Sequence, residues 1–192
     1  MPFEDLAFLF TCGRESRGIC RLDFDEAALL YKTVRGLRQS GSRGARGVEI
    51  GRYHGGSTLL LADAVGMGGL VTSIDIHKGN AKRAEALLKR VRLLVRARIV
   101  VGDSKEVKGP RHELDFVFID GDHSYEGVKA DQDKWGAFVR PGGMVIHHDM
   151  TPSPTPGRNG PQRVFHELME GDEFEFVASA SSLVVFEKKE RE

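Results

Sequence analysis

Short runs of β-branched and aromatic residues alternate along this chain with longer stretches whose apolar residues recur at helical spacing. The runs that resemble strands lie at residues 47–50, 70–74, 98–101, 114–119 and 144–147. The fourth run, LDFVFI, is almost continuously apolar, which is typical of a strand buried on both faces. Helical patterns follow the first, second and fourth runs, at residues 56–65, 80–95 and 125–139. The alternation predicts βαβ units around a mostly parallel sheet.

Further elements flank this region on both sides. A loosely amphipathic helix is expected over residues 25–39, followed by a linker over 40–47. A proline-rich segment follows the fifth strand, and after it come a short helix and two strands, at residues 151–161, 162–169, 174–178 and 183–187. The 192 residues suit a single domain, with residues 1–45 as an N-terminal helical segment and 46–192 as its core.

Charge and composition exclude several classes of function. The chain has 28 Lys+Arg against 28 Asp+Glu, so no net field attracts nucleic acid or an anionic membrane. No apolar run approaches the roughly 20 residues of a membrane-spanning helix. Cys12 and Cys20 are too few for a disulfide scaffold, and the first ten residues carry Glu4 and Asp5 where a signal peptide would be basic. We therefore expect a cytoplasmic protein without nucleic-acid or membrane partners.

The loop after the first strand has the composition of a ligand-binding turn. It reads VEIGRYHGGST, with Glu49 at the end of the strand, Gly51 and Gly55 in the turn, and Ser57 near the start of the next helix. Glycine lets the backbone approach a nucleotide-like ligand closely. Tyr53 stands where a dinucleotide fingerprint needs glycine, which argues against NAD or FAD. A plain strand-to-helix turn is the alternative.

The next two strands also end in polar residues. Asp75 follows the second strand, where a carboxylate can accept hydrogen bonds from ribose hydroxyls, and Asp103 and Ser104 follow the third, within reach of an adenine ring. A solvated aspartate in a turn is the alternative for Asp75. Three polar strand ends on one rim favour an adenosine-containing cofactor.

The ends of the fourth and fifth strands carry candidate catalytic residues. Asp120 ends one strand, and His148 and Asp149 end the other. Two carboxylates beside an imidazole suit Mg²⁺ or Mn²⁺ completed by water and substrate hydroxyls. Cofactor hydrogen bonding and helix capping are the alternative roles for the two aspartates.

Five segments together carry a resemblance to class I S-adenosylmethionine-dependent methyltransferases: VEIGRYHGGST, SIDIH, VVGDS, LDFVFIDGDHSYEGVKAD and RPGGMVIHHDM. The chain is most similar to the small-molecule O-methyltransferases that include macrolide-sugar methyltransferases and cephalosporin hydroxylase-like proteins. The resemblance covers the chain from Val48 onward. It implies an α/β fold, a Rossmann-like three-layer αβα sandwich with a seven-stranded, mostly parallel sheet and an antiparallel last strand.

The resemblance also assigns roles to individual residues. It implies that Glu49 and Gly51 line the methionine part of S-adenosylmethionine, that Asp75 holds ribose, and that Asp103 and Ser104 lie near adenine. The remaining cofactor contacts that we expect are Tyr53, Gly55, Ser57, Ile76 and Asp120.

In the metal-dependent members of this group, ligands stand at the positions of Asp120, His148 and Asp149, and the middle position is usually acidic. His148 departs from that pattern, which favours a softer ion such as Mn²⁺ or no metal at all. In the metal-dependent sugar methyltransferases the histidine of a DxxH sequence supplies the general base, so the resemblance implies this role for His123, three residues after Asp120. An imidazole is suited to it because it titrates near neutral pH. Helix capping is the alternative for His123.

We therefore predict an enzyme that moves the methyl group of S-adenosylmethionine to a hydroxyl of a small molecule, with His123 and Asp120 as catalytic residues and possible assistance from Mg²⁺ or Mn²⁺. The alternatives are an NAD-type oxidoreductase and a cofactor-binding protein without transfer activity. Because the N-terminal elements are short, we expect a homo-oligomer in which a second subunit completes the acceptor pocket.

Overall fold

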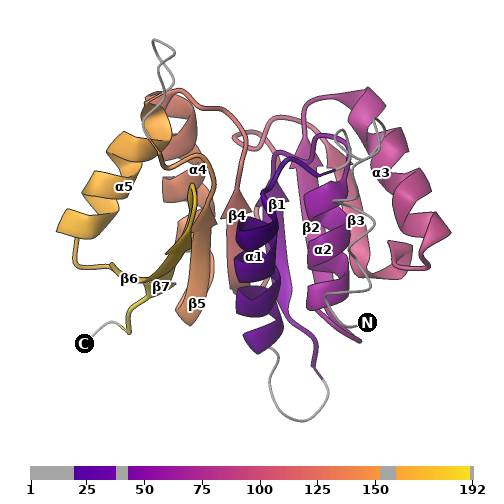
Figure 1. Ribbon diagram of the computed structural model, residues 1–192, viewed down its shortest axis with the longest axis horizontal. Helices are drawn as coiled ribbons and strands as arrows, with labels where there is room; N and C mark the ends of the chain where they lie inside the picture. Colours follow the sequence, from indigo (N-terminus) through magenta and orange to yellow (C-terminus); the bar gives the residue numbers. More distant parts are fainter. Residues whose placement is uncertain (1–19, 38–42, 152–158, 191–192) are drawn as a thin grey trace.

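The computed structural model describes residues 20–37, 43–151 and 159–190, and its centre is a seven-stranded sheet (Figure 1). The strand order is β3-β2-β1-β4-β5-β7-β6. The strands are β1 (Arg46–Ile50), β2 (Leu70–Asp75), β3 (Ala97–Val101), β4 (Leu114–Ile119), β5 (Val139–His147), β6 (Phe174–Ala180) and β7 (Leu183–Lys188). The first five strands run parallel, and β7 is antiparallel to both of its neighbours. The predicted fold is confirmed.

Helices cover both faces of the sheet and bury two separate apolar clusters. The helices are α1 (Phe24–Gly36), α2 (Gly56–Ala64), α3 (Lys78–Arg90), α4 (Tyr125–Ala137) and α5 (Gly160–Glu170), with a short 3₁₀ helix at Leu94–Arg96. Residues of α1 and α2 share one cluster with side chains from the sheet, and residues of α4 and α5 share the other. Every residue of α2 is buried, including the polar Ser57, Thr58 and Asp63, which explains why its sequence has no polar stripe facing solvent. None of the described helices has the length and apolar character needed to cross a membrane.

Two elements, β5 and α3, differ from their predicted bounds by five residues at one end. Strand β5 starts five residues before the predicted run, because the Pro-Gly-Gly stretch joins the sheet through an irregularity opposite Leu114 and Phe116. Gly142 there has φ +69, and a Cβ on Gly143 would lie 2.9 Å from the Asp115 carbonyl oxygen, so both glycines are needed. The predicted helix over 80–95 instead ends at Arg90, because Arg92 adopts a left-handed conformation at φ 59.

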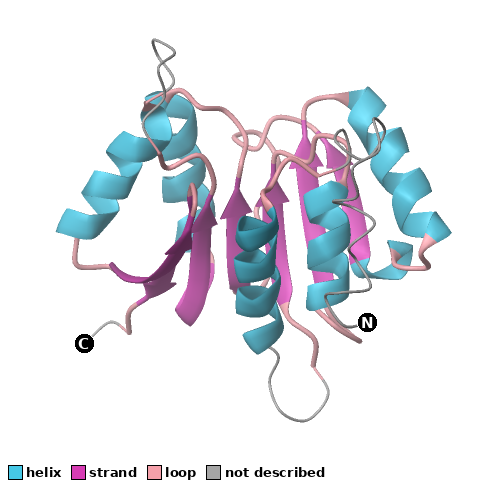
Figure 2. Ribbon diagram, in the orientation of Figure 1, coloured by secondary structure: helices cyan, strands magenta, loops and turns pink. Residues whose placement is uncertain are grey.

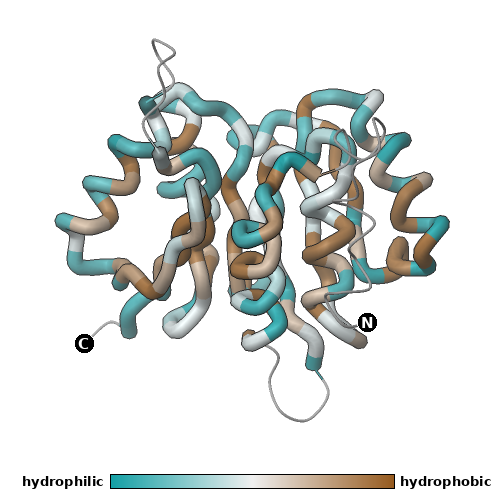
Figure 3. The backbone as a smooth tube through the Cα atoms, in the orientation of Figure 1, coloured by the Kyte–Doolittle hydropathy of each residue, from teal (hydrophilic) through white to brown (hydrophobic). Residues whose placement is uncertain are grey.

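The parallel strands β1 to β5 all end at the same edge of the sheet (Figure 2). The loops at that edge are mostly hydrophilic, whereas brown, hydrophobic segments gather in the strands and in the helix faces below (Figure 3). The parallel topology therefore brings the polar strand ends noted in the sequence to one rim.

Candidate active site

A cavity of about 430 Å³ opens at the carboxyl ends of β1 to β4. Of the ten predicted cofactor contacts, seven line it: Gly51, Tyr53, Asp75, Ile76, Asp103, Ser104 and Asp120. The other three, Glu49, Gly55 and Ser57, do not line it. Sequence reasoning missed His77, Asn80 and Lys105, which also lie on its wall. The strand ends that the sequence identified therefore do converge on one space.

Gly51 allows the loop after β1 to pass closely over the end of β4. Its φ is +86, and a Cβ there would lie 1.8 Å from the carbonyl oxygen of Asp120. The Gly51 N–H donates to the Ile74 carbonyl at 3.0 Å, and the Asp120 N–H donates to the Ile50 carbonyl at 2.8 Å. No side chain fits at this position, so the loop stays open toward the cavity.

Asp75 fixes the shape of that loop from the end of β2. Its Oδ2 accepts the N–H groups of Arg52 at 3.1 Å and Tyr53 at 2.9 Å, and its Oδ1 accepts the N–H of His77 at 2.6 Å. The Asn80 amide adds a contact of 3.2 Å to Oδ2. Most acceptor positions of the carboxylate are thus occupied by the protein, so Asp75 both organises the loop and lines the cavity.

A buried layer of charge lies beneath the loop. Glu49 is 0% exposed, and its Oε2 accepts hydrogen bonds of 2.5 Å from Thr58 and Ser73. Burial raises the pKa of Glu49, and the hydrogen bonds from hydroxyl groups oppose the shift. Arg52 is 1% exposed, and its Nη1 donates to the carbonyl oxygens of Ser73 at 2.6 Å and Val100 at 3.2 Å. Arg52 was not predicted, because an arginine in a loop is ordinarily exposed.

Asp131 of α4 is another functional candidate that the sequence analysis missed. It is 2% exposed, lines the cavity and accepts a 2.6 Å hydrogen bond from Ser104. Burial raises the pKa of Asp131, and the hydrogen bond from Ser104 opposes that shift. Helical periodicity could have placed Asp131, the seventh residue of α4, on the side of the helix that faces the sheet. Nothing in the sequence indicates that it contacts Ser104.

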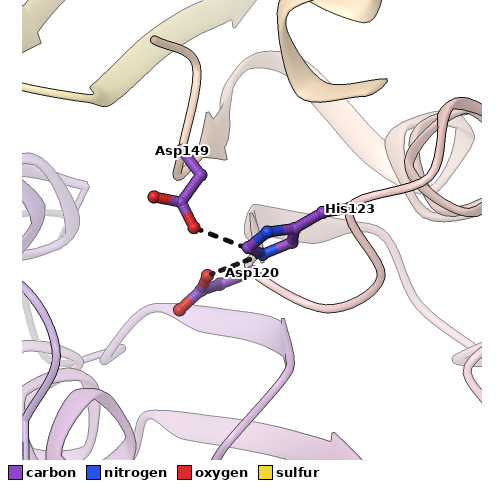
Figure 4. A group of neighbouring side chains, drawn as sticks. All are labelled: Asp120, His123 and Asp149. Carbon is purple, nitrogen blue, oxygen red and sulfur yellow. Dashed lines mark ion pairs between the residues drawn. The ribbon is translucent and has the colours of Figure 1, made fainter. Parts of the chain in front are cut away.

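At the β4–β5 side of the rim, two carboxylates point toward the ring of His123 (Figure 4). His123 Nε2 lies 3.2 Å from Asp149 Oδ2 and 4.0 Å from Asp120 Oδ1. Asp149 reaches this position from a left-handed turn, with φ 57. The side chains of Asp120, His123 and Asp149 are 20%, 27% and 43% exposed, so the cluster is open to solvent and small molecules. Since Asp120 also lines the cavity, the cluster and the cavity form one site.

His148 lies behind this cluster rather than in it. Its ring is 8% exposed; Nδ1 lies 3.1 Å from Asp120 Oδ1, and Nε2 lies 3.1 Å from Glu26 Oε2. Burial alone would lower the pKa of His148, but hydrogen bonds with Asp120, Asp149 and Glu26 raise it to about 12. Burial also raises the pKa of Asp120, and its hydrogen bond with His148 opposes that shift. We place the shared proton on the ring, because carboxylates on both of its sides favour the imidazolium.

This geometry bears on the predicted metal set of Asp120, His148 and Asp149. A histidine ligand needs a free lone pair on one ring nitrogen, whereas both nitrogens of His148 face a carboxylate oxygen at 3.1 Å, and on the imidazolium assigned above both of them donate. With the ring as it lies, this set does not fit a divalent ion. Among the described residues, Asp120, His123 and Asp149 each offer one ligand atom within 4.8 Å of the others. However, the carboxylates of Asp120 and Asp149 already face the His148 imidazolium, with Oδ1 of Asp120 at 3.1 Å and Oδ2 of Asp149 at 3.5 Å from its Nδ1.

Most of the proline-rich segment that follows the fifth strand, residues 152–158, lies outside the described residues. His147, the last residue of β5, points away from the cluster, and its Nε2 lies 2.7 Å from Oε1 of Gln132 in α4.

Comparison with known proteins gives a family match over the centre of the chain. Residues 48–150 match the model of a family described as a methyltransferase domain. The matched part runs from β1 to just beyond Asp149, and therefore contains the cavity strands and the cluster at their ends.

Solved structures share the whole fold. An O-methyltransferase from Bacillus cereus, in complex with SAH, is 19% identical with a TM-score of 0.68, over 87% of this chain and 82% of that chain. TomG from Streptomyces achromogenes, an O-methyltransferase of tomaymycin synthesis in complex with SAM, is 18% identical with a TM-score of 0.68, over 88% and 82%. A protein from Corynebacterium glutamicum has a TM-score of 0.77 at 17% identity, over 100% and 99%. At these identities the likeness establishes the fold.

Proposed function

The chain belongs to the methyltransferase-domain family, and from this premise we propose that it transfers the methyl group of S-adenosylmethionine to a hydroxyl oxygen of a small molecule. The observation that carries the proposal is the position of Asp120, which lies both on the cavity wall and in the cluster with His123. A cofactor in the cavity would therefore have its reactive end beside a base. Two structural neighbours that hold SAM or SAH and are named O-methyltransferases support this choice.

The cavity suits the cofactor in size and polarity. At about 430 Å³ it lies within the range of small-molecule sites, and its polar groups sit at the strand ends. We propose that the ribose lies at Asp75, that the adenine lies toward Asp103 and Ser104, and that the sulfonium lies near Asp120. Asp131 borders the adenine end and holds Ser104 in place.

The reaction that these residues support is an in-line displacement. The acceptor hydroxyl gives its proton to the imidazole of His123 while its oxygen forms a bond to the methyl carbon. The carbon–sulfur bond breaks, its electron pair stays on sulfur, and S-adenosylhomocysteine leaves. The imidazolium so formed is stabilised by Asp149, whose carboxylate lies 3.2 Å from Nε2. Because His148 is engaged on both ring nitrogens, we write the reaction without a divalent ion.

Calorimetry with S-adenosylhomocysteine and with NAD tests the cofactor. We expect the protein to bind S-adenosylhomocysteine and not NAD; the reverse preference would make it an NAD-type oxidoreductase and refute the proposal.

The base is tested with methyl-tritiated S-adenosylmethionine and a panel of sugar, polyketide and catechol hydroxyl compounds. In His123→Ala we expect kcat/KM to fall by about 10²- to 10⁴-fold while the affinity for S-adenosylhomocysteine stays close to that of the wild type. His112→Ala, which removes an exposed ring away from the cavity, serves as the matched control. Cofactor binding with no transfer to any acceptor would favour a binding protein, and unchanged turnover in His123→Ala would remove the proposed base.

A further inference from the structure

Helix α1 lies outside the matched residues 48–150, yet it contributes a carboxylate to the active-site rim. Glu26 is 3% exposed and accepts four hydrogen bonds. Its Oε1 accepts from the Ser182 N–H at 2.9 Å and the Ser182 hydroxyl at 2.6 Å, and its Oε2 accepts from the Asp23 N–H at 2.8 Å and His148 Nε2 at 3.1 Å. Each oxygen thus has two donors, so the carboxylate is fixed between α1, the end of β5 and the β6–β7 turn.

The opposite edge of the His148 ring faces the cavity side. Its Nδ1 lies 3.1 Å from Asp120 Oδ1 and 3.5 Å from Asp149 Oδ2. A single N–H therefore lies between the two carboxylates that converge on His123. Without a positive charge at this point, two carboxylates held so close together would repel one another.

We propose that Glu26 is a positioning residue of the methyl-transfer site, and that by holding His148 as an imidazolium it gives the site a built-in cation that keeps Asp120 and Asp149 in place without a divalent metal ion. Only the name of the reaction rests on the function proposed above; the arrangement of Glu26, His148 and the two aspartates stands independently of it.

The surroundings of the ring support a fixed positive charge. The ionisable groups that act on it include Glu26 of α1, Asp120 after β4, Asp149 after β5 and Cys20 before α1. His123 faces the same two aspartates from their other side. Burial raises the pKa of Glu26, but hydrogen bonds from His148, Ser182 and the Asp23 N–H lower it to about 2. Burial raises the pKa of the Cys20 thiol to about 11, so this thiol adds no negative charge near neutral pH. The ring therefore has three anionic neighbours.

The test uses the full-length protein with ¹⁵N-labelled histidine. In the wild type, NMR at about pH 8 is expected to show protons on both ring nitrogens of His148, well above the pKa of about 6.5 of a free imidazole. Titration with Mn²⁺ followed by electron paramagnetic resonance is expected to show no stoichiometric binding up to about 1 mM free ion. A neutral His148 ring, or one Mn²⁺ bound per chain, would overturn the inference.

Variants separate a positioning role from a structural one. Glu26→Gln retains a residue suited to the capping box of α1 but removes the charge, and it should lower the midpoint of the His148 titration by about 1 to 3 pH units. Glu167→Gln removes an exposed carboxylate that bonds Tyr125 and should leave that midpoint unchanged. An unchanged midpoint in Glu26→Gln would refute the role of Glu26. If this variant does not fold, the two wild-type measurements still decide for or against the built-in cation.

Calorimetry with S-adenosylhomocysteine on the same wild-type sample keeps the two proposals apart. Binding of S-adenosylhomocysteine together with a neutral His148 ring would refute the built-in cation and leave the proposed function standing. A protonated ring without such binding would refute the function and leave the arrangement of charges intact.

Discussion

Two consecutive histidines at the end of β5 have opposite environments, and the fully buried one, His147, makes the clearest prediction about stability. His147 is 0% exposed; its Nε2 lies 2.7 Å from Gln132 Oε1, and its Nδ1 has no hydrogen-bond partner among the described residues. A carbonyl oxygen can only accept, so Nε2 carries a proton, and the buried Nδ1 without a partner is the lone-pair nitrogen of a neutral ring. Burial lowers the pKa of His147 to about 3.

The consequence for folding follows from linkage. An unfolded histidine has a pKa of about 6.5, so between that value and about 3 the unfolded chain binds a proton that the folded chain does not. Stability therefore falls as the pH falls, by up to about 1.4 kcal/mol per pH unit. From pH 7.5 to pH 5 the contribution of His147 amounts to a loss of about 2 kcal/mol.

Urea unfolding of the wild type and of His147→Gln at several pH values between 5 and 7.5 measures this contribution. Glutamine keeps an N–H donor for Gln132 and does not titrate in this range. Groups common to both proteins cancel in the difference, so the wild type should lose about 2 kcal/mol more than the variant between pH 7.5 and pH 5. Parallel curves for the two proteins would show that His147 is not held neutral by burial, and would refute this reasoning.

Three further predictions concern the cavity and the thiol. Gly51→Ala places a Cβ 1.8 Å from the Asp120 carbonyl oxygen in a left-handed conformation, and should weaken S-adenosylhomocysteine binding about tenfold or more in calorimetry; an unchanged Kd would contradict it. Asp75→Ala leaves three backbone N–H groups without their acceptor and should lower the free energy of unfolding, measured with urea, by about 1–3 kcal/mol. A change below a few tenths of a kcal/mol would show that the loop does not depend on the Asp75 carboxylate. Burial raises the pKa of Cys20 to about 11, so in a Cys12→Ser background the Cys20 thiol should react with Ellman's reagent about a hundredfold more slowly in the folded protein than in urea. Equal rates in the two states would count against this prediction.

Strand ends were the part of the site that the sequence predicted best. A parallel sheet brings the carboxyl ends of its strands to one edge, so a polar residue directly after an apolar run has a predictable place. Asp75, Asp103 and Asp120 all line the cavity for this reason. Glu49 stands one residue before the end of β1, and its side chain points below the loop to Thr58 and Ser73 instead. Successive side chains of a strand point to opposite faces of the sheet, so a shift of one residue decides whether a side chain at the strand end faces a ligand.

Residues that depend on contacts between distant elements had no signal in the sequence. Arg52 is buried because its guanidinium reaches the carbonyl oxygens of Ser73 and Val100, on two other strands. Periodicity gives the face of an element but not the partner of a side chain, so a charged residue in a loop is read as solvated. Asp131, which meets Ser104 across 27 positions of sequence, was missed for the same reason.

Glu26 shows that the N-terminal helix is part of the site rather than an addition to it. The sequence favoured a division at residue 46, with a helical segment before it and the cofactor-binding core after it, because the βαβ pattern begins there. In the structure that division separates Glu26 from His148, which lies 122 positions later and relies on it as a hydrogen-bond partner. It also removes Leu30 and Val34, both 0% exposed, from the apolar cluster under α2. A core that began at β1 would expose the buried imidazolium and leave it with only the two cavity-side carboxylates, so the charge at the rim depends on α1 as much as on the strands.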